Sequence, residues 1–290
     1  MQHILYKLFL DDTLEDLDKK YKEIFEKEME KTFLYSNIIE FTNYYKLFSK
    51  KDNKDYGINQ KLHTRKHEET IHLLKQEILE NNYDTEALMF LYGYISHLIF
   101  DYYINSYIKN LMSKNKIKDT KKNHKKVAEK IESLYYETRY NEKIKKYKIN
   151  PNTYTITPRL KELLNKVLKE IHLNSMGIKV FEISLQNYKK TKENVFYKIR
   201  FKLFKNNKYS ASIKYRVKKV NKKIDYLNKE KSPWYLEGIM QVNDSFNELY
   251  KKAKTDALAI INTLNEEIFY KKKIKNSSTM QLNAFIKNRW

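Results

Sequence analysis

The residues best suited to chemistry lie in the least polar part of the chain, the stretch GYISHLIFDYYINSYI at residues 93–108. If this stretch is helical, residues four apart fall on one face, so His97, Asp101 and Asn105 form a polar stripe. An imidazole nitrogen and a carboxylate oxygen at this spacing can bind one zinc ion. A hydrogen-bonded pair in the core has the same pattern, and taken alone it is the commoner explanation.

Two other histidines of the middle third stand where a helix is expected to begin or to be interrupted. These are His63 and His124, and together with the stripe they supply candidate metal ligands from three segments. His67 and His72 adjoin Glu68 and Glu69, and we expect both of them to face solvent. The elements that position these residues must therefore be helices that converge on one place.

Helical periodicity and helix-start signals dominate the sequence. Four glycines and three prolines leave few tight turns, which argues against a sandwich or a barrel. We predict an all-α fold, with residues 1–290 forming a single multi-helix domain. The expected helices are Thr13 to about Thr32, 36–48, 65–81, one capped by Asp84, 122–144, one starting at Thr157-Pro158, and one starting with a capping box of Ser245 and Glu248.

The segment 195–219 gives two conflicting signals. Apolar and polar residues alternate in FYKIRFKLF and KYSASIKYRV, with Asn206-Asn207 between them, which is typical of a β-hairpin. Tyr188, Val195 and Ile199 also fit one face of a helix. Periodicity therefore leaves a short β-hairpin and a helix as alternatives here.

Composition limits the class of protein further. Cysteine is absent, which excludes disulfides and thiolate metal sites. We predict no signal peptide at the start of the chain. No uncharged apolar stretch reaches the eighteen or so residues that a membrane span needs. We therefore expect a cytoplasmic protein without a transmembrane segment, for which peripheral association with a membrane stays open.

The charge of the chain favours anionic partners. The net charge is +22, from 58 Lys and Arg against 36 Asp and Glu, and residues 189–231 hold 16 basic against 3 acidic residues. Such a field suits phosphate, lipid head groups or nucleic acid. Drift in composition, as an AT-rich genome encodes it, explains the same numbers about equally well. The candidate anion-binding residues are Lys198, Lys202, Lys205, Lys218, Lys219, Lys222 and Lys223.

Several segments, in order, resemble the zinc-dependent phospholipase C family, in its small bacterial members without a C-terminal lipid-binding domain. They are KLHTRKHEETIHLLKQEI (61–78), LYGYISHLIFDYYINSYI (91–108), HKKVAEKIESLYYETRYNEKIKKYKI (124–149), DYLNKEKSPWYLEG (225–238), DSFNELYKKAKTDALAIINTL (244–264) and NSSTMQLNAF (276–285). The resemblance covers most of the chain. It implies a helical fold, including residues 186–222, and a zinc cluster that hydrolyses phosphodiesters. The zinc ligands that it implies are His63, His97, Asp101, His124 and, more weakly, His3.

The sequence departs from this family at several expected ligands. Asn105 stands where the family has a histidine, Ala128 where it has a glutamate, and Asn43 near an expected aspartate. Asparagine brings no charge to a zinc site, and alanine cannot bind. Glu132 or Glu129 would then act as the base or as a substitute ligand. The retained residues imply fewer zinc ions than the family's cluster, down to one or none.

Two hypotheses about function follow from this pattern. The first is a divergent phospholipase C-like phosphoester hydrolase with a reduced metal site. The second is a non-catalytic descendant of that fold, whose basic surface binds nucleic acid, a nucleic-acid-handling protein or anionic lipid. Beside both stands the plain reading that His97 and Asp101 satisfy each other in the core.

Overall fold

The computed structural model describes residues 3–25, 67–144, 155–170, 178, 181–187, 224–236, 240–270 and 277–286. This part of the chain is helical apart from one small hairpin, which confirms the predicted all-α class. The organisation of residues 1–290 as one domain stays a prediction. The labelled helices are α1 (His3–Glu15), α2 (Lys19–Phe25), α5 (His67–Glu80), α6 (Thr85–Lys114), α7 (Lys121–Tyr140), α8 (Pro158–Glu170), α11 (Phe246–Phe269) and α12 (Ser278–Ile286).

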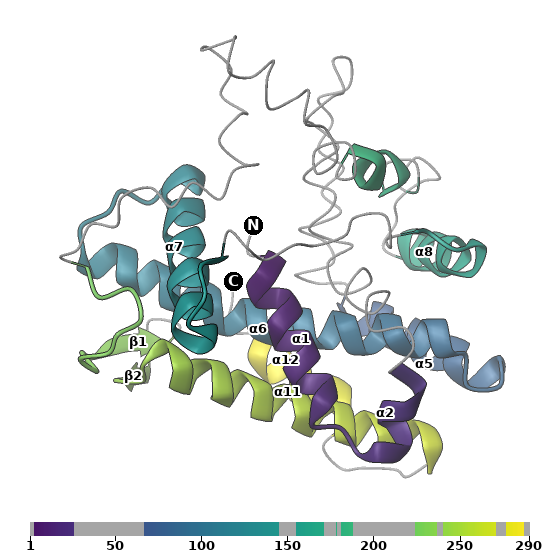
Figure 1. Cartoon of the computed structure of the whole chain (residues 1–290). Helices are drawn as coiled ribbons and strands as arrows, with labels where there is room; N and C mark the ends of the chain where they lie inside the picture. Colours follow the sequence, from purple (N-terminus) through teal and green to yellow (C-terminus); the bar gives the residue numbers. More distant parts are fainter. Residues whose placement is uncertain are drawn as a thin grey trace.

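The core is built on α6, which is buried on nearly all sides (Figure 1). Helix α11 runs antiparallel beside it. Tyr107 near the end of α6 packs against Phe246 at the start of α11, with ring centroids 5.4 Å apart. At the other end, the Tyr92 hydroxyl donates a hydrogen bond to the side-chain oxygen of Asn265. A helix that is apolar all round must be covered all round, so α6 requires neighbours on every face.

Helix α1 lies across α6 and α11 and supplies one of these covers (Figure 1). The Phe9 ring stacks on Phe100 of α6, with centroids 4.4 Å apart, and meets the edge of Tyr250 of α11 at 5.5 Å. Such aromatic pairs add to the free energy of burying the rings. The apolar run near the start of the chain is therefore a core helix.

Most helix ends lie where their signals predict. Asp84 caps α6, and its Oδ1 accepts hydrogen bonds from the backbone N–H groups of Glu86 and Ala87 at 2.9 and 3.2 Å. The capping box of Ser245 and Glu248 starts α11 as predicted. Pro158 is the first residue of α8.

The predicted helix from Thr13 to Thr32 is wrong at its start. Thr13 lies inside α1, where its hydroxyl donates to the backbone oxygen of Phe9 at 2.7 Å. The chain leaves helical geometry at residues 16–18 and resumes it in α2. The reason is that the apolar residues before Thr13 are themselves helical and buried. The predicted helix at 36–48 and the hairpin or helix at 195–219 lie outside the described residues.

A hairpin that the sequence analysis did not predict precedes α11. Strand β1 (Trp234–Leu236) pairs antiparallel with β2 (Met240–Val242), with Tyr235 opposite Gln241. The Trp234 indole N–H donates to the backbone oxygen of Asp244 at 3.0 Å, and its ring meets the edge of Tyr107. The hairpin thereby fixes the chain just before α11 begins.

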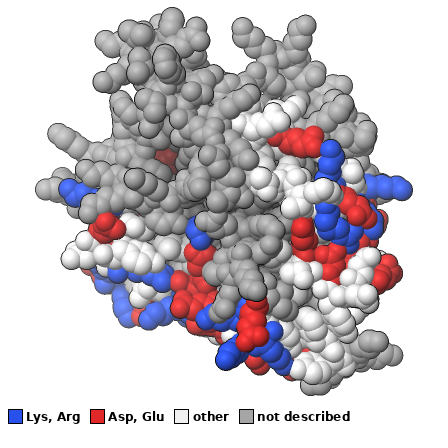
Figure 2. All heavy atoms as spheres, turned by 45° about the vertical axis from the view of Figure 1, so that its right-hand side comes forward, with Lys and Arg blue, Asp and Glu red and all other residues white. Residues whose placement is uncertain are grey.

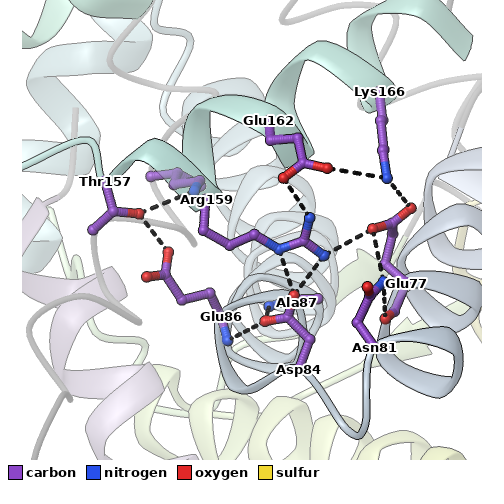
Figure 3. Close-up of polar contacts among 10 residues, drawn as sticks. Glu77, Asn81, Asp84, Glu86, Ala87, Thr157, Arg159, Glu162 and Lys166 are labelled. Carbon is purple, nitrogen blue, oxygen red and sulfur yellow. Dashed lines mark hydrogen bonds and ion pairs between the residues drawn. The ribbon is translucent and has the colours of Figure 1, made fainter.

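A network of ion pairs joins the junction of α5 and α6 to α8 (Figure 3). Arg159 of α8 pairs with Glu77, with the cap residue Asp84 and with Glu162. Lys166 also pairs with Glu77, at 2.6 Å. Acidic and basic side chains are accordingly interleaved on this side of the molecule (Figure 2). Because most of these charges are balanced locally, the network holds helices together and leaves little net field.

We predict that Asp84→Ala destabilises the protein more than Glu162→Ala does. Asp84 both caps α6 and holds Arg159, and 11% of its side chain is exposed, against 52% for Glu162. Loss of a cap costs about 1 kcal/mol, and loss of an exposed ion pair about 0.5 kcal/mol or less. Thermal unfolding followed by circular dichroism should show a melting temperature several degrees lower for Asp84→Ala alone. Equal shifts for the two variants would mean that the cap and the partly buried pair contribute nothing.

Candidate functional site

The predicted polar stripe on α6 is present, and a tyrosine of α1 covers it. His97 and Asp101 lie on one face of α6 and are 1% and 9% exposed. The Tyr6 ring stacks on the His97 ring, with centroids 4.8 Å apart and planes 24° apart. The Tyr6 hydroxyl donates a hydrogen bond to Asp101 Oδ1. The His97–Asp101 pair is therefore buried beneath an aromatic ring.

Glu132 belongs to α7, and its fully buried side chain contacts the first turn of α1. Its Oε2 accepts hydrogen bonds from the backbone N–H groups of Ile4 and Leu5, at 3.1 and 3.2 Å. These are groups of the first turn of α1, which have no partner within their own helix. Glu132 thus caps α1 from a distant helix, with its negative charge at the positive end of the helix dipole.

Burial controls the ionisation of Glu132. Burial raises the pKa of the carboxyl to about 7, and the hydrogen bonds from Leu5 and Ile4 oppose this rise only in part. The other oxygen, Oε1, has no hydrogen-bond partner in the described part of the chain. The group can therefore take up a proton near neutral pH.

His124 lies in the first turns of α7 and is partly exposed. Burial lowers the pKa of its imidazole, while the negative charge of Asp101 raises it. The two predicted ligands, from α7 and α6, are thus close enough to influence each other. Glu129 is partly exposed, 3.9 Å from Lys125, and Ala128 is packed in the core.

The other predicted site residues fall outside what can be described. His63, Asn43 and the predicted anion-binding lysines lie outside the described residues, and so does most of the segment 189–231. His3 is the first residue of α1, but its side chain is not described. The lysines concerned are Lys198, Lys202, Lys205, Lys218, Lys219, Lys222 and Lys223.

The predicted zinc ligands that the structure describes do not form a metal site by themselves, and His63 and the side chain of His3 are not described. No group of three or more His, Cys, Asp or Glu side chains in the described ranges is arranged to hold a metal ion. A zinc ion at the stripe would also have to compete with the Tyr6 hydroxyl for Asp101 Oδ1. The arrangement instead gives Asp101 and one oxygen of Glu132 hydrogen bonds from α1.

The sequence analysis missed Tyr6 and misjudged His67. Tyr6 belongs to the run HILYKLFL, where Leu5, Phe9 and Leu10 recur at helical spacing, and this periodicity was the available signal. His67 is buried, contrary to the prediction that it faces solvent. It begins the stripe of α5 that continues at Thr70, Ile71 and Leu74 and packs into the core.

We predict that Tyr6→Phe costs more stability than Tyr103→Phe. Both changes remove a hydroxyl that donates to a carboxylate, of Asp101 and of Asp256 respectively, but only Asp101 is buried. A hydrogen bond to a charged group contributes about 1.5–3 kcal/mol, and a buried carboxylate left without its donor incurs the larger loss. Chemical denaturation should show the difference, and Asp101→Ala should abolish most of the effect of Tyr6→Phe in a double-mutant cycle. Additive effects in that cycle would show that the two side chains do not interact.

We predict that Glu132→Gln flattens the pH dependence of stability. The native carboxyl has a pKa of about 7 against a usual value of 4.5, so the folded state binds the proton more tightly than the unfolded chain does. The stabilisation of the folded state by this bound proton is fully present below pH 4.5 and is lost as the pH rises to about 7. Glutamine keeps an oxygen for the N–H groups of α1 and carries no charge. Between pH 4.5 and 7 the free energy of unfolding of the variant, measured in urea melts, should therefore rise relative to that of wild type. Glu129→Gln is the control, and an unchanged slope for Glu132→Gln would contradict the assignment.

None of the described helices is long and apolar enough to cross a membrane. Comparison with models of protein families finds no match to this chain. Comparison with curated proteins and with solved structures finds no match either. The resemblance to the zinc-dependent phospholipase C family therefore rests on the sequence motifs alone.

Proposed function

We propose that this chain is a non-catalytic protein of phospholipase C-like helical fold that binds an anionic partner. The contact of Tyr6 with the His97–Asp101 pair carries the first half of this proposal. A catalytic metal ion is held by lone pairs of its ligands and keeps one coordination position open. Here the Tyr6 hydroxyl binds one oxygen of Asp101, the Tyr6 ring covers the face of His97, and Glu132 is engaged in capping α1.

The distribution of charge supports the second half. The described residues hold 25 Lys and Arg against 28 Asp and Glu, and the rest of the chain holds 33 against 8. The excess of positive charge therefore lies outside the described residues. The partner would be nucleic acid, a nucleic-acid-handling protein or anionic lipid, bound in the cytoplasm or at a membrane surface.

Metal-dependent phosphoester hydrolysis is the second candidate, and two observations favour it. Asp101 and His124 influence each other from neighbouring helices, and Glu132 keeps one buried oxygen without a hydrogen bond in the described part. With His63 and His3 these residues would make up a reduced zinc site. Glu132 or Glu129 would act there as the base or as a further ligand.

Metal analysis separates the two candidates. We predict that protein purified without chelator contains far less than one zinc ion per chain, and that added zinc leaves its melting temperature unchanged. A structural or catalytic zinc site would instead stabilise the fold. About one zinc per chain, lost in His97→Ala and retained in Tyr103→Phe, would overturn the non-catalytic proposal. Hydrolysis of a chromogenic phosphodiester by the zinc-loaded protein would then establish the second candidate.

Binding to polyanions tests the remaining half of the proposal. Fluorescence titration with oligonucleotides and with anionic vesicles, each at 50 and 200 mM salt, should show at least one ligand bound at the lower concentration. Because such binding is driven by counterion release, its affinity should fall steeply at the higher one. If neither ligand binds at 50 mM salt, the net charge of +22 reflects composition and the proposal fails.

A further inference from the structure

The described part of the chain separates its charges. Residues 109–126, at the corner between α6 and α7, hold eight lysines and one acidic residue, Asp119. The other described residues together hold 17 Lys and Arg against 27 Asp and Glu. The corner is thus a basic surface on a part of the protein that is otherwise acidic.

Most of these lysines are exposed and have no ion-pair partner among the described residues. Lys125 is partly exposed and lies 3.9 Å from Glu129, and the side chain of Lys121 is not described. The remaining six are exposed, and none of them forms an ion pair with a residue that the structure describes. We call them the corner lysines: Lys109, Lys114, Lys116, Lys118, Lys122 and Lys126.

The backbone that carries the corner lysines is held in place. The N–H of Ile117 donates to the backbone oxygen of Met112 at 2.8 Å, and the Asn123 side chain donates to that of Lys118 at 2.9 Å. Thr120 caps α7 by accepting from the N–H of Asn123 at 3.1 Å. Ile117 packs against the core. A surface built on such a corner loses little backbone entropy when it binds a partner.

Helix stability explains Lys114, which lies in the last turn of α6, but it does not explain the lysines of α7. The first turn of α7 contains lysine and no acidic residue, which places positive charge at the positive end of the helix dipole. Lys109, near the end of α6, adds a further exposed positive charge to the same segment. Like charges gathered in this way repel one another, and a polyanion removes that repulsion.

From this surface we infer that the corner lysines bind the phosphodiester backbone of duplex nucleic acid, independently of its sequence. The inference rests on the proposed function and names a surface for it. Lysine acts on phosphate as a point charge and reads no base without further contacts. Duplex DNA offers the densest row of such phosphates, about one charge per 1.7 Å of helix axis.

The side chains around the corner disfavour other polyanions. Single strands are bound largely by stacking of bases on exposed aromatic rings, and surface helices enter membranes through exposed apolar residues. The large exposed hydrophobic residues of the described part lie on other segments, such as Tyr83, Tyr140, Tyr235 and Met240. A surface that offers charge alone fits a rigid backbone of phosphates best.

The test compares two fourfold variants of the full-length protein. One is Lys114→Gln, Lys118→Gln, Lys122→Gln and Lys126→Gln. The control carries Lys143→Gln, Lys169→Gln, Lys229→Gln and Lys251→Gln, four exposed lysines spread over other segments. Both lose the same charge, and circular dichroism checks that both fold. Fluorescence anisotropy then measures binding to a labelled 20-base-pair duplex, a single strand of the same length and anionic vesicles, from 50 to 200 mM salt.

We expect the corner variant to bind the duplex at least tenfold more weakly than the control variant does at 100 mM salt. The slope of log affinity against log salt should become shallower by about 3 to 4, since each phosphate contact contributes about −0.9. Equal losses in the two variants would overturn the corner assignment while leaving the proposed function intact. Tighter binding to vesicles or to the single strand would overturn the assignment of duplex nucleic acid as the ligand. Wild type that binds none of the three ligands would overturn the proposed function as well.

Discussion

The structure depends on how the polar groups of α1 are satisfied inside the protein. The first N–H groups of this helix are buried, and the carboxylate of Glu132 on α7 accepts hydrogen bonds from them. A buried N–H without an acceptor costs several kcal/mol relative to water, so the helix can occupy this place only if residue 132 supplies an acceptor oxygen. The carboxylate incurs its own desolvation cost, which appears as its raised pKa. Each group makes the burial of the other tolerable.

The same principle extends along the whole of α1. Tyr6 donates to Asp101 on α6, and further on Asp12 accepts from Arg139 on α7 and from Tyr250 on α11. The apolar face of α1, led by Phe9, covers α6 between these polar contacts. Three helices are thus joined through one short helix. Asp101 is a member of this network and His97 stacks on Tyr6 within it, which is why we favour a structural role for these two predicted ligands.

Many charged side chains of the described helices form ion pairs with one another. Arg159 and Lys166 neutralise acidic groups of α5 and of the cap of α6. Similar pairs join α1 to α7, and Asp16, just after α1, to α11. Partly buried pairs of this kind fix the arrangement of helices more than they attract ligands. Against this background, lysines that have no such partner among the described residues stand out at the α6–α7 corner. A field of this kind acts on partners from outside, because nothing in the described helices neutralises it.

Local signals in the sequence determined the fold class and most helix ends. Asp84, Pro158 and the Ser245–Glu248 box act within one turn of their own helix, so their effect can be predicted without knowing what packs nearby. The pairing of Tyr6 with Asp101 and of Glu132 with α1 joins residues about one hundred positions apart. No local pattern marks such partners, and burial alone makes their hydrogen bonds obligatory. Helical spacing therefore predicted the His97–Asp101 stripe. Only the tertiary structure shows that Tyr6 covers it, because Tyr6 comes from α1, a helix that the sequence analysis did not place.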